Sequence, residues 1–330
     1  MLSDTALEYL SEALPVQGRA LSLRVSFNRS LINSIRYLLD ACVEVLPSHL
    51  YTKALQNLDS LRENLKLSGF LSVLHADFFE ATDQSNVERV LKITEKLCSD
   101  RFQVQELTYV NFSSLNETKD CYYYSLLETL FSQEIIRDVK FFSLSHTDFN
   151  KVRDSIQNGL QLLKRSFPDF FEEFQDLVSE ILILNAQALA QGSSSDLFGM
   201  IYKCYLHKWE KITDVFEFII HEQSHLYVFS LNKDDKLVLN SREMHESPLR
   251  KEQRPLMGIY HAAFILARVC HVLHKSLALN IIPETERVYC QQLLVDYKKY
   301  YLESFKTIKD HAQMTPLGEA LIHSANKLMQ

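Results

Sequence analysis

Residues 215–225 have the sequence VFEFIIHEQSH, and they give the clearest indication of how this chain folds. Apart from Glu217, the residues before the first histidine are apolar, and the stretch lies within a longer helical pattern, Lys208–Leu231. Positions four apart on a helix lie one above the other, so His221 and His225 share one side. We therefore expect a core helix that directs two imidazoles toward one point.

The rest of the chain also favours helices. Gly and Pro occur only 7 times each among 330 residues, whereas a repetitive β fold needs many turn residues. Further helices are expected at Leu31–Leu46, Tyr51–Leu65, Ser85–Cys98, Asp148–Pro168, Leu256–Leu279 and Glu284–Lys309. Short strands are expected at 139–144, 181–185, 197–203 and 236–240, with a further one in the less clear stretch 102–110, and polar loops at 111–120, 192–196 and 241–253. The predicted fold class is mainly α (α+β), with a few short strands around the helix that carries the histidines.

The sequence changes character near residue 175, where helical patterns give way to short apolar runs. We therefore expect a helical front part, residues 1–175, and a rear part, residues 176–330, that carries the metal site and any catalytic residues.

Charge, cysteine use and the N-terminus limit the class of protein. The formal net charge of −7 argues against a surface that binds nucleic acid throughout. The six cysteines are dispersed without a C-x-x-C pair, as expected for reduced thiols in the cytoplasm. Residues 1–15 lack the features of a signal peptide, and no apolar run approaches the roughly 20 residues that span a bilayer. We expect a cytoplasmic protein that binds neither nucleic acid nor membrane.

The histidine pair suits a divalent metal, because each neutral imidazole supplies one lone pair in a fixed direction. Glu222 lies about 100° round the helix from His221, so it cannot join the same stack but could reach a water molecule on the metal. The alternative is a pair of core histidines, and these would need backbone or water partners. The spacing of His221 and His225 therefore indicates a metal centre.

A catalytic metal needs more than two histidines. One large group of zinc peptidases continues with Gly and His at fixed offsets, where this chain has Val228 and Leu231, so that group is disfavoured. Another group takes a carboxylate from a later helix. The candidates for it are Glu243, Glu246 and Glu252, which lie in a charged loop.

His261 is a different candidate for the third ligand. It lies in an apolar helical stretch, and its neighbours Ala262 and Ala263 would let a ligand approach closely. Arg268 lies about two turns further on, near the same face. A guanidinium in an apolar helix needs an anionic partner, because it cannot lose its charge. That partner would be a carboxylate-bearing ligand beside the metal or a structural salt bridge.

Taken together, these residues resemble a known family, the HExxH-type 2-oxoglutarate-dependent peptide β-hydroxylases. The resemblance covers Ile181–Arg268, and only the histidine pair is specific by itself. The matching pieces are Gly192-Ser193-Ser194-Ser195 with Phe198-Gly199, then His221-Glu222-x-x-His225, then Arg254-Pro255-Leu256-x-Gly258-x-x-His261, and finally Arg268.

The resemblance implies an oxidoreductase, a non-haem iron dioxygenase of RiPP biosynthesis. It would use Fe(II), 2-oxoglutarate and O₂ to hydroxylate the β-carbon of a residue in a ribosomally made precursor peptide. The front part, residues 1–175, is then the candidate for peptide recognition.

The implied site residues follow from the same resemblance. The metal ligands would be His221, His225 and His261, the co-substrate residues Arg268, Arg254, Ser193 and Ser195, and the catalytic residue Glu222. Three histidines depart from the usual set of two histidines and one carboxylate. Glu222 and the acids of the later loop therefore stay open as ligands.

Two other functions are compatible with the sequence. A zinc metallopeptidase would use Glu222 as the general base for a metal-bound water. A non-enzymatic helical interaction module would keep the histidines as structural residues and bind no metal.

Overall fold

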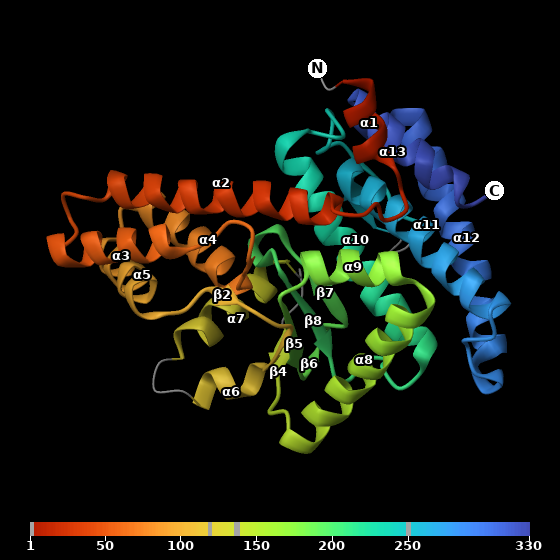
Figure 1. Ribbon diagram of the computed structural model, residues 1–330, viewed down its shortest axis with the longest axis horizontal. Coiled ribbons are helices and arrows are strands. Elements are labelled where there is room, and N and C mark those ends of the chain that lie inside the picture. The colour runs from red at the N-terminus through yellow and green to blue at the C-terminus, as the bar shows by residue number, and fades with distance from the viewer. Residues whose placement is uncertain (1–2, 118–120, 135–138, 249–251) are drawn as a thin grey trace. The chain divides into compact units, whose positions relative to one another are not determined.

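The computed structural model describes residues 3–117, 121–134, 139–248 and 252–330 (Figure 1). The chain is 66% helical, with thirteen α-helices and a few short strands among the described residues, so the predicted mainly α fold is confirmed. It divides into two compact units. The first comprises Met1–Ala20, Lys151–Phe174 and Lys208–Gln330, and the second comprises Leu21–Asn150 and Gln175–His207. The predicted boundary near residue 175 coincides with one crossing between them, and each unit takes segments from both sides of it.

The second unit contains a four-stranded sheet with the order β3-β5-β8-β7. Its two central strands, β5 (Glu180–Leu184) and β8 (Met200–Cys204), run parallel and are buried along their whole length. Continuous apolar runs are typical of parallel strands covered on both faces. β3 (Thr108–Asn111) adds a parallel edge and β7 (Gln191–Ser193) an antiparallel one. The strands predicted at 181–185 and 197–203 are therefore confirmed.

Helices supply the rest of the second unit. They are α2 (Arg19–Ala41), which begins in the first unit, α3 (Ser48–Ser60), α4 (Gly69–Asp83), α5 (Val87–Ser99), α6 (Phe112–Glu117), α7 (Tyr122–Glu134) and the 3₁₀ turn η1 (Ser195–Leu197). Two short strand pairs complete it, β1 (Lys66–Leu67) with β2 (Gln103–Val104) and β4 (Lys140–Phe141) with β6 (Ala186–Gln187).

Two predicted loops of this unit contain regular structure. The prediction of a loop at 111–120 was wrong over 112–117, which form α6. The side chain of Asn111 accepts a hydrogen bond from the Ser113 N–H, and the buried ring of Phe112 anchors the first turn. The predicted loop at 192–196 begins inside β7, because Gly192 and Ser193 pair with Tyr202 and Ile201 of β8.

The first unit is a helical assembly with one short hairpin. Its elements are α1 (Asp4–Ser11), most of α8 (His146–Ser166) and α9 (Pro168–Leu177), α10 (Ile212–Asp234), β9 (Met244–Glu246), β10 (Gln253–Pro255), α11 (Leu256–Ala278), α12 (Glu284–His311) and α13 (Pro316–Lys327). α11 packs against α10, α12 and α13, and α1 packs against α13. The strand predicted at 236–240 is absent from these described residues, where only an isolated bridge joins Val238 to Met314.

α11 is the central helix of the first unit. It is long and apolar enough to span a membrane by length and composition, but 78% of its most apolar 18-residue window is buried inside the protein. That burial is typical of the core helix of a soluble protein.

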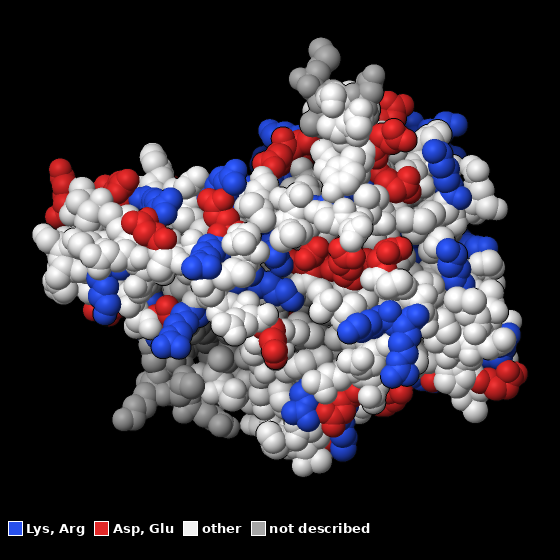
Figure 2. Space-filling model, in the orientation of Figure 1, with Lys and Arg blue, Asp and Glu red and all other residues white. Residues whose placement is uncertain are grey.

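On the face shown in Figure 2, basic and acidic side chains are interspersed, so neither sign of charge dominates it.

Candidate metal centre

α10 presents one accessible stripe on an otherwise buried helix. Between Thr213 and Leu231 every residue is buried except Glu217, His221, His225 and Phe229, which follow one another at intervals of four. Side chains at this spacing lie along one helix face. The predicted histidine pair therefore lies on the accessible line of α10 between Thr213 and Leu231.

The start of α10 is held by α12. Lys211 gives no side-chain cap, and the Glu286 carboxylate accepts hydrogen bonds from the backbone N–H groups of Ile212 and Thr213, at 3.2 and 3.0 Å. A carboxylate at this position satisfies N–H groups that a helix leaves without partners and favours its dipole. This cap fixes the helix that carries the histidines.

Glu217 orients the first histidine. His221 Nδ1 lies 3.0 Å from Glu217 Oε1, and because a carboxylate only accepts, Nδ1–H is the donor. Glu217 also accepts a hydrogen bond from the Tyr297 hydroxyl of α12 at 3.2 Å. Burial and the charge of Glu217 raise the pKa of Tyr297, which stays protonated. Donation from Nδ1 puts the imidazole lone pair on Nε2, the arrangement usual in carboxylate–histidine–metal sites.

His261 completes a row of three imidazoles. The ring centres of His221 and His225 lie 5.1 Å apart, and those of His225 and His261 lie 5.6 Å apart. Two imidazoles bound to one tetrahedral ion at about 2.0–2.1 Å have ring centres about 5 Å apart. The structure thus brings together the three predicted metal ligands, although a shared ion would require their rings to turn so that the nitrogen atoms converge.

The environment of His261 suits a metal ligand. Its side chain is buried, and its Nε2 has no hydrogen-bond partner among the described residues. Burial, with a smaller contribution from the charge of Arg254, lowers the pKa of His261 to about 4. The imidazole is therefore neutral at pH 7, which is the form that binds a metal.

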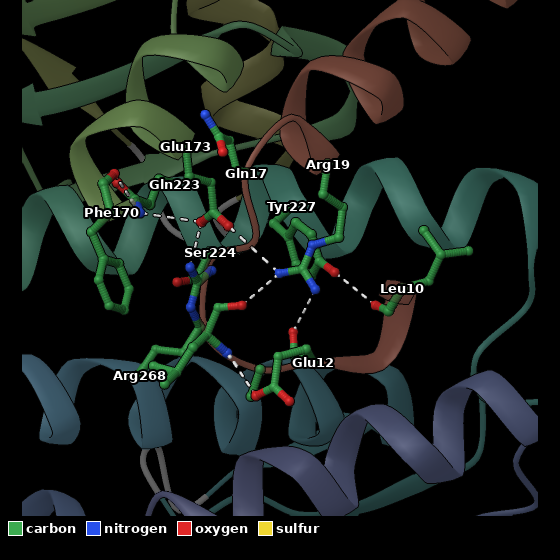
Figure 3. Close-up of polar contacts among 12 residues, drawn as sticks. Leu10, Glu12, Gln17, Arg19, Phe170, Glu173, Gln223, Ser224, Tyr227 and Arg268 are labelled. Atoms are coloured by element: carbon green, nitrogen blue, oxygen red, sulfur yellow. Dashed lines mark hydrogen bonds and ion pairs between the residues drawn. The ribbon is translucent and has the colours of Figure 1, made fainter. Parts of the chain in front are cut away.

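Arg268 does not have the surroundings predicted for a co-substrate residue. Its side chain is fully buried and forms an ion pair with Glu173 of α9 (Figure 3). Its guanidinium also lies 4.9 Å from the ring centre of Phe170 and 5.4 Å from that of Phe264. A co-substrate carboxylate would have to displace Glu173, so the structure supports the salt-bridge alternative for Arg268.

Arg254 is the predicted arginine that lies near the histidines. It is half-buried on β10, directly opposite His245 of β9, and its charge acts on His261. Residues directly opposite in an antiparallel pair project from the same face of the ribbon. Arg254 and His245 therefore share one side of the β9–β10 hairpin.

The other predicted site residues are buried, belong to the second unit or lie in the segment around β9 and β10. Glu222 is only 1% exposed within α10. Ser193 lies in β7 and Ser195 in η1, and both belong to the second unit. Glu243, Glu246 and Glu252 are all exposed, and Glu243 also accepts a hydrogen bond from His245.

Sequence reasoning missed two residues at this site. Glu217 is four positions before His221, and this spacing was a usable signal, since a carboxylate one turn away reaches the imidazole. Tyr297 comes from a helix 80 positions away in sequence and had no local signal. No protein-family model matches the chain, and no curated protein matches it.

Proposed function

We propose that this chain is an Fe(II)- and 2-oxoglutarate-dependent oxygenase of the cytoplasm that hydroxylates the β-carbon of a residue in a ribosomally made precursor peptide. The observation that carries the proposal is His261, whose buried Nε2 has no partner among the described residues and whose ring lies 5.6 Å from that of His225. A buried polar atom of this kind calls for a partner, and a metal ion would be one.

The side chains present fit such an ion. His221, His225 and His261 would hold it, and three protein ligands leave positions open for a co-substrate and oxygen. Bound there, iron would supply the activation of O₂ that hydroxylation of an unactivated carbon requires. Glu217 would keep His221 in the metal-binding tautomer, and burial would keep His261 neutral.

Arg254 is the residue we assign to the co-substrate. A planar guanidinium can bind a carboxylate through two parallel hydrogen bonds, and Arg254 lies close enough to His261 for its charge to depress that pKa. Arg268 stabilises the core through Glu173 instead. We therefore expect Arg254→Lys to raise the KM for 2-oxoglutarate and to leave the content of bound metal nearly unchanged.

The test measures metal content and succinate formation in the same samples. Iron-loaded chain with 2-oxoglutarate and a precursor peptide should release succinate and add one oxygen atom to the peptide. His261→Ala should lose both iron and succinate formation, whereas His274→Ala, an exposed histidine on the same helix, should lose neither. If the iron-loaded chain with its cognate peptide gives no oxygenated product by mass spectrometry, the proposed oxygenase activity is wrong.

Glu222 separates this proposal from a zinc peptidase. A peptidase would hydrolyse peptides when loaded with zinc and would lose that activity in Glu222→Gln, because the general base would be gone. An oxygenase would show no peptide cleavage in either protein. Zinc-dependent cleavage that disappears in Glu222→Gln would therefore replace the oxygenase proposal with the peptidase one.

A further inference from the structure

A second group of side chains of the kinds that bind metals lies at the end of α12. The donor atoms of Glu243, His245 and His311 all lie within 4.8 Å of one another. Among the described residues, these three form the one cluster of His, Cys, Asp or Glu side chains whose donor atoms are this close. Glu243 directly precedes β9, His245 lies in β9, and His311 is the last residue of α12. The three residues come from segments more than sixty positions apart in the first unit.

Hydrogen bonds already hold these donors together. His245 Nε2–H donates to Glu243 Oε1 at 2.8 Å, and the imidazoles of His245 and His311 stack with their ring centres 4.4 Å apart. The carboxamide of Asn240 donates to Glu243 Oε2 at 2.8 Å and to the His311 carbonyl at 2.9 Å. It also accepts a hydrogen bond from the Gln313 N–H at 2.8 Å. Asn240 thus ties the carboxylate and the end of α12 to one point, as outer partners do in metal sites.

The distances are close to those of a bound ion. Two atoms bound to one tetrahedral zinc at about 2.0–2.1 Å lie about 3.4 Å apart, so donors within 4.8 Å need side-chain rotation rather than backbone movement. A divalent cation would replace the proton now shared by Glu243 and His245. Glu243 and Asn240 also line an open hollow of about 600 Å³, so solvent reaches this side of the group.

We propose that Glu243, His245 and His311 form a second metal site, selective for Zn²⁺ or a similar borderline cation. Two imidazoles and one carboxylate are a usual donor set for zinc, with water in the fourth position. Because His245 lies opposite Arg254 in the hairpin, the ion would fasten the β9–β10 ribbon, and Arg254 with it, to the end of α12. The site does not depend on the histidines of α10.

The test counts zinc in a chain that lacks the first site. Metal-free His221→Ala/His225→Ala protein is dialysed against Zn²⁺, and bound zinc is measured by elemental analysis. We expect one equivalent, and we expect Glu243→Gln or His311→Ala in this background to weaken binding by at least about tenfold. His323→Ala, an exposed histidine on α13, is the matched control and should keep the full equivalent.

Two results would overturn the proposal. In the first, the His221→Ala/His225→Ala protein binds no zinc. In the second, it binds zinc, and neither Glu243→Gln nor His311→Ala weakens the binding. Glu243 is half exposed, so Glu243→Gln should fold normally even if His311→Ala does not. Loss of zinc binding in Glu243→Gln with unchanged circular dichroism would support the site.

Discussion

Replacing Glu173 by glutamine should strongly destabilise the first unit. Glu173 is 4% exposed and forms an ion pair with Arg268, and its Oε2 lies 3.9 Å from a guanidinium nitrogen of Arg19 (Figure 3). Arg19 and Arg268 are themselves 1% and 0% exposed, so this one carboxylate compensates two buried cations. Glu173→Gln would preserve the shape of the side chain and remove the charge.

The expected loss is a large part of the stability of a domain. At 3.9 Å and an effective dielectric constant of about 20, the attraction between Glu173 and Arg19 alone is about 4 kcal/mol. Removing one partner of a buried ion pair costs about 3–5 kcal/mol, because the other charge stays buried. Gln223, whose amide donates to Glu173 Oε1 at 3.2 Å, can still bond the new amide oxygen. We therefore expect a loss of about 3–4 kcal/mol.

The assay is urea unfolding followed by tryptophan fluorescence. Trp209 is the only tryptophan of the chain and belongs to the first unit, so its emission reports on that unit. Glu172→Gln, on the same helix but half-buried, is the matched control and should change stability by less than about 0.5 kcal/mol. Adding Arg268→Met to Glu173→Gln should recover stability, because it removes one uncompensated cation.

The outcome that contradicts this account is a loss below about 1 kcal/mol in Glu173→Gln, comparable with the loss in Glu172→Gln. Such a result would mean that the two guanidinium groups find other partners. Arg268 would then be available again as a residue for binding the co-substrate carboxylate.

Three further perturbations test other parts of the structure. Burial raises the pKa of Glu180 from its ordinary value of 4.5 to about 7, so the folded chain keeps a proton that the unfolded chain loses, and stability should fall by about 3 kcal/mol as pH rises between those values. Glu180→Gln should abolish this slope in urea titrations from pH 4.5 to 7.5, and an unchanged slope would contradict the assignment. Gly159→Ala would bring its new Cβ to 2.3 Å from Val215 Cγ1 and should cost about 1–2 kcal/mol in urea unfolding after the gain in helix propensity. In a Val215→Ala background the same change should be neutral, and an equal cost there would rule out the clash. Glu217→Gln should weaken metal binding at His221 by about 10–100-fold in competition with a chelator, with no change in circular dichroism, and wild-type affinity would show that Glu217 does not orient the imidazole.

The sequence predicted best those elements whose signals are local. The predicted ranges for α11 and α12 differ from the structure by at most two residues, because proline precedes each helix and the apolar spacing is regular. β5 was predictable because the continuous apolar run of four residues at 181–184 suits a strand buried on both faces. α6 was missed because its polar composition hides the cap at Asn111 and the anchor at Phe112.

At the candidate site, too, the features with a local sequence signal were predicted and those that depend on distant residues were not. The spacing of His221 and His225 predicted their common face, and the structure places both on the accessible stripe of α10. The sequence left two partners open for Arg268, a ligand or a salt bridge, since Glu173 is 95 positions away and nothing local links the two. Glu243, His245 and His311 likewise come together only through the packing of α12.

The contact between α1 and α13 bears on how the chain folds during synthesis. The Ala13 N–H donates to Ser324 Oγ at 2.9 Å, and Arg19 donates to the carbonyls of Glu12 and Leu14 at 2.8 Å. The first unit therefore needs a segment made early and one made more than 300 residues later. At about 5–20 residues per second, the ribosome separates them by at least about 15 seconds. Until α13 is made, the nascent α1 lacks its contacts with that helix, and the second unit, complete by residue 207, can fold first. Completion of the first unit is then a late event, in which α13 replaces solvent on the face of α1 that it covers.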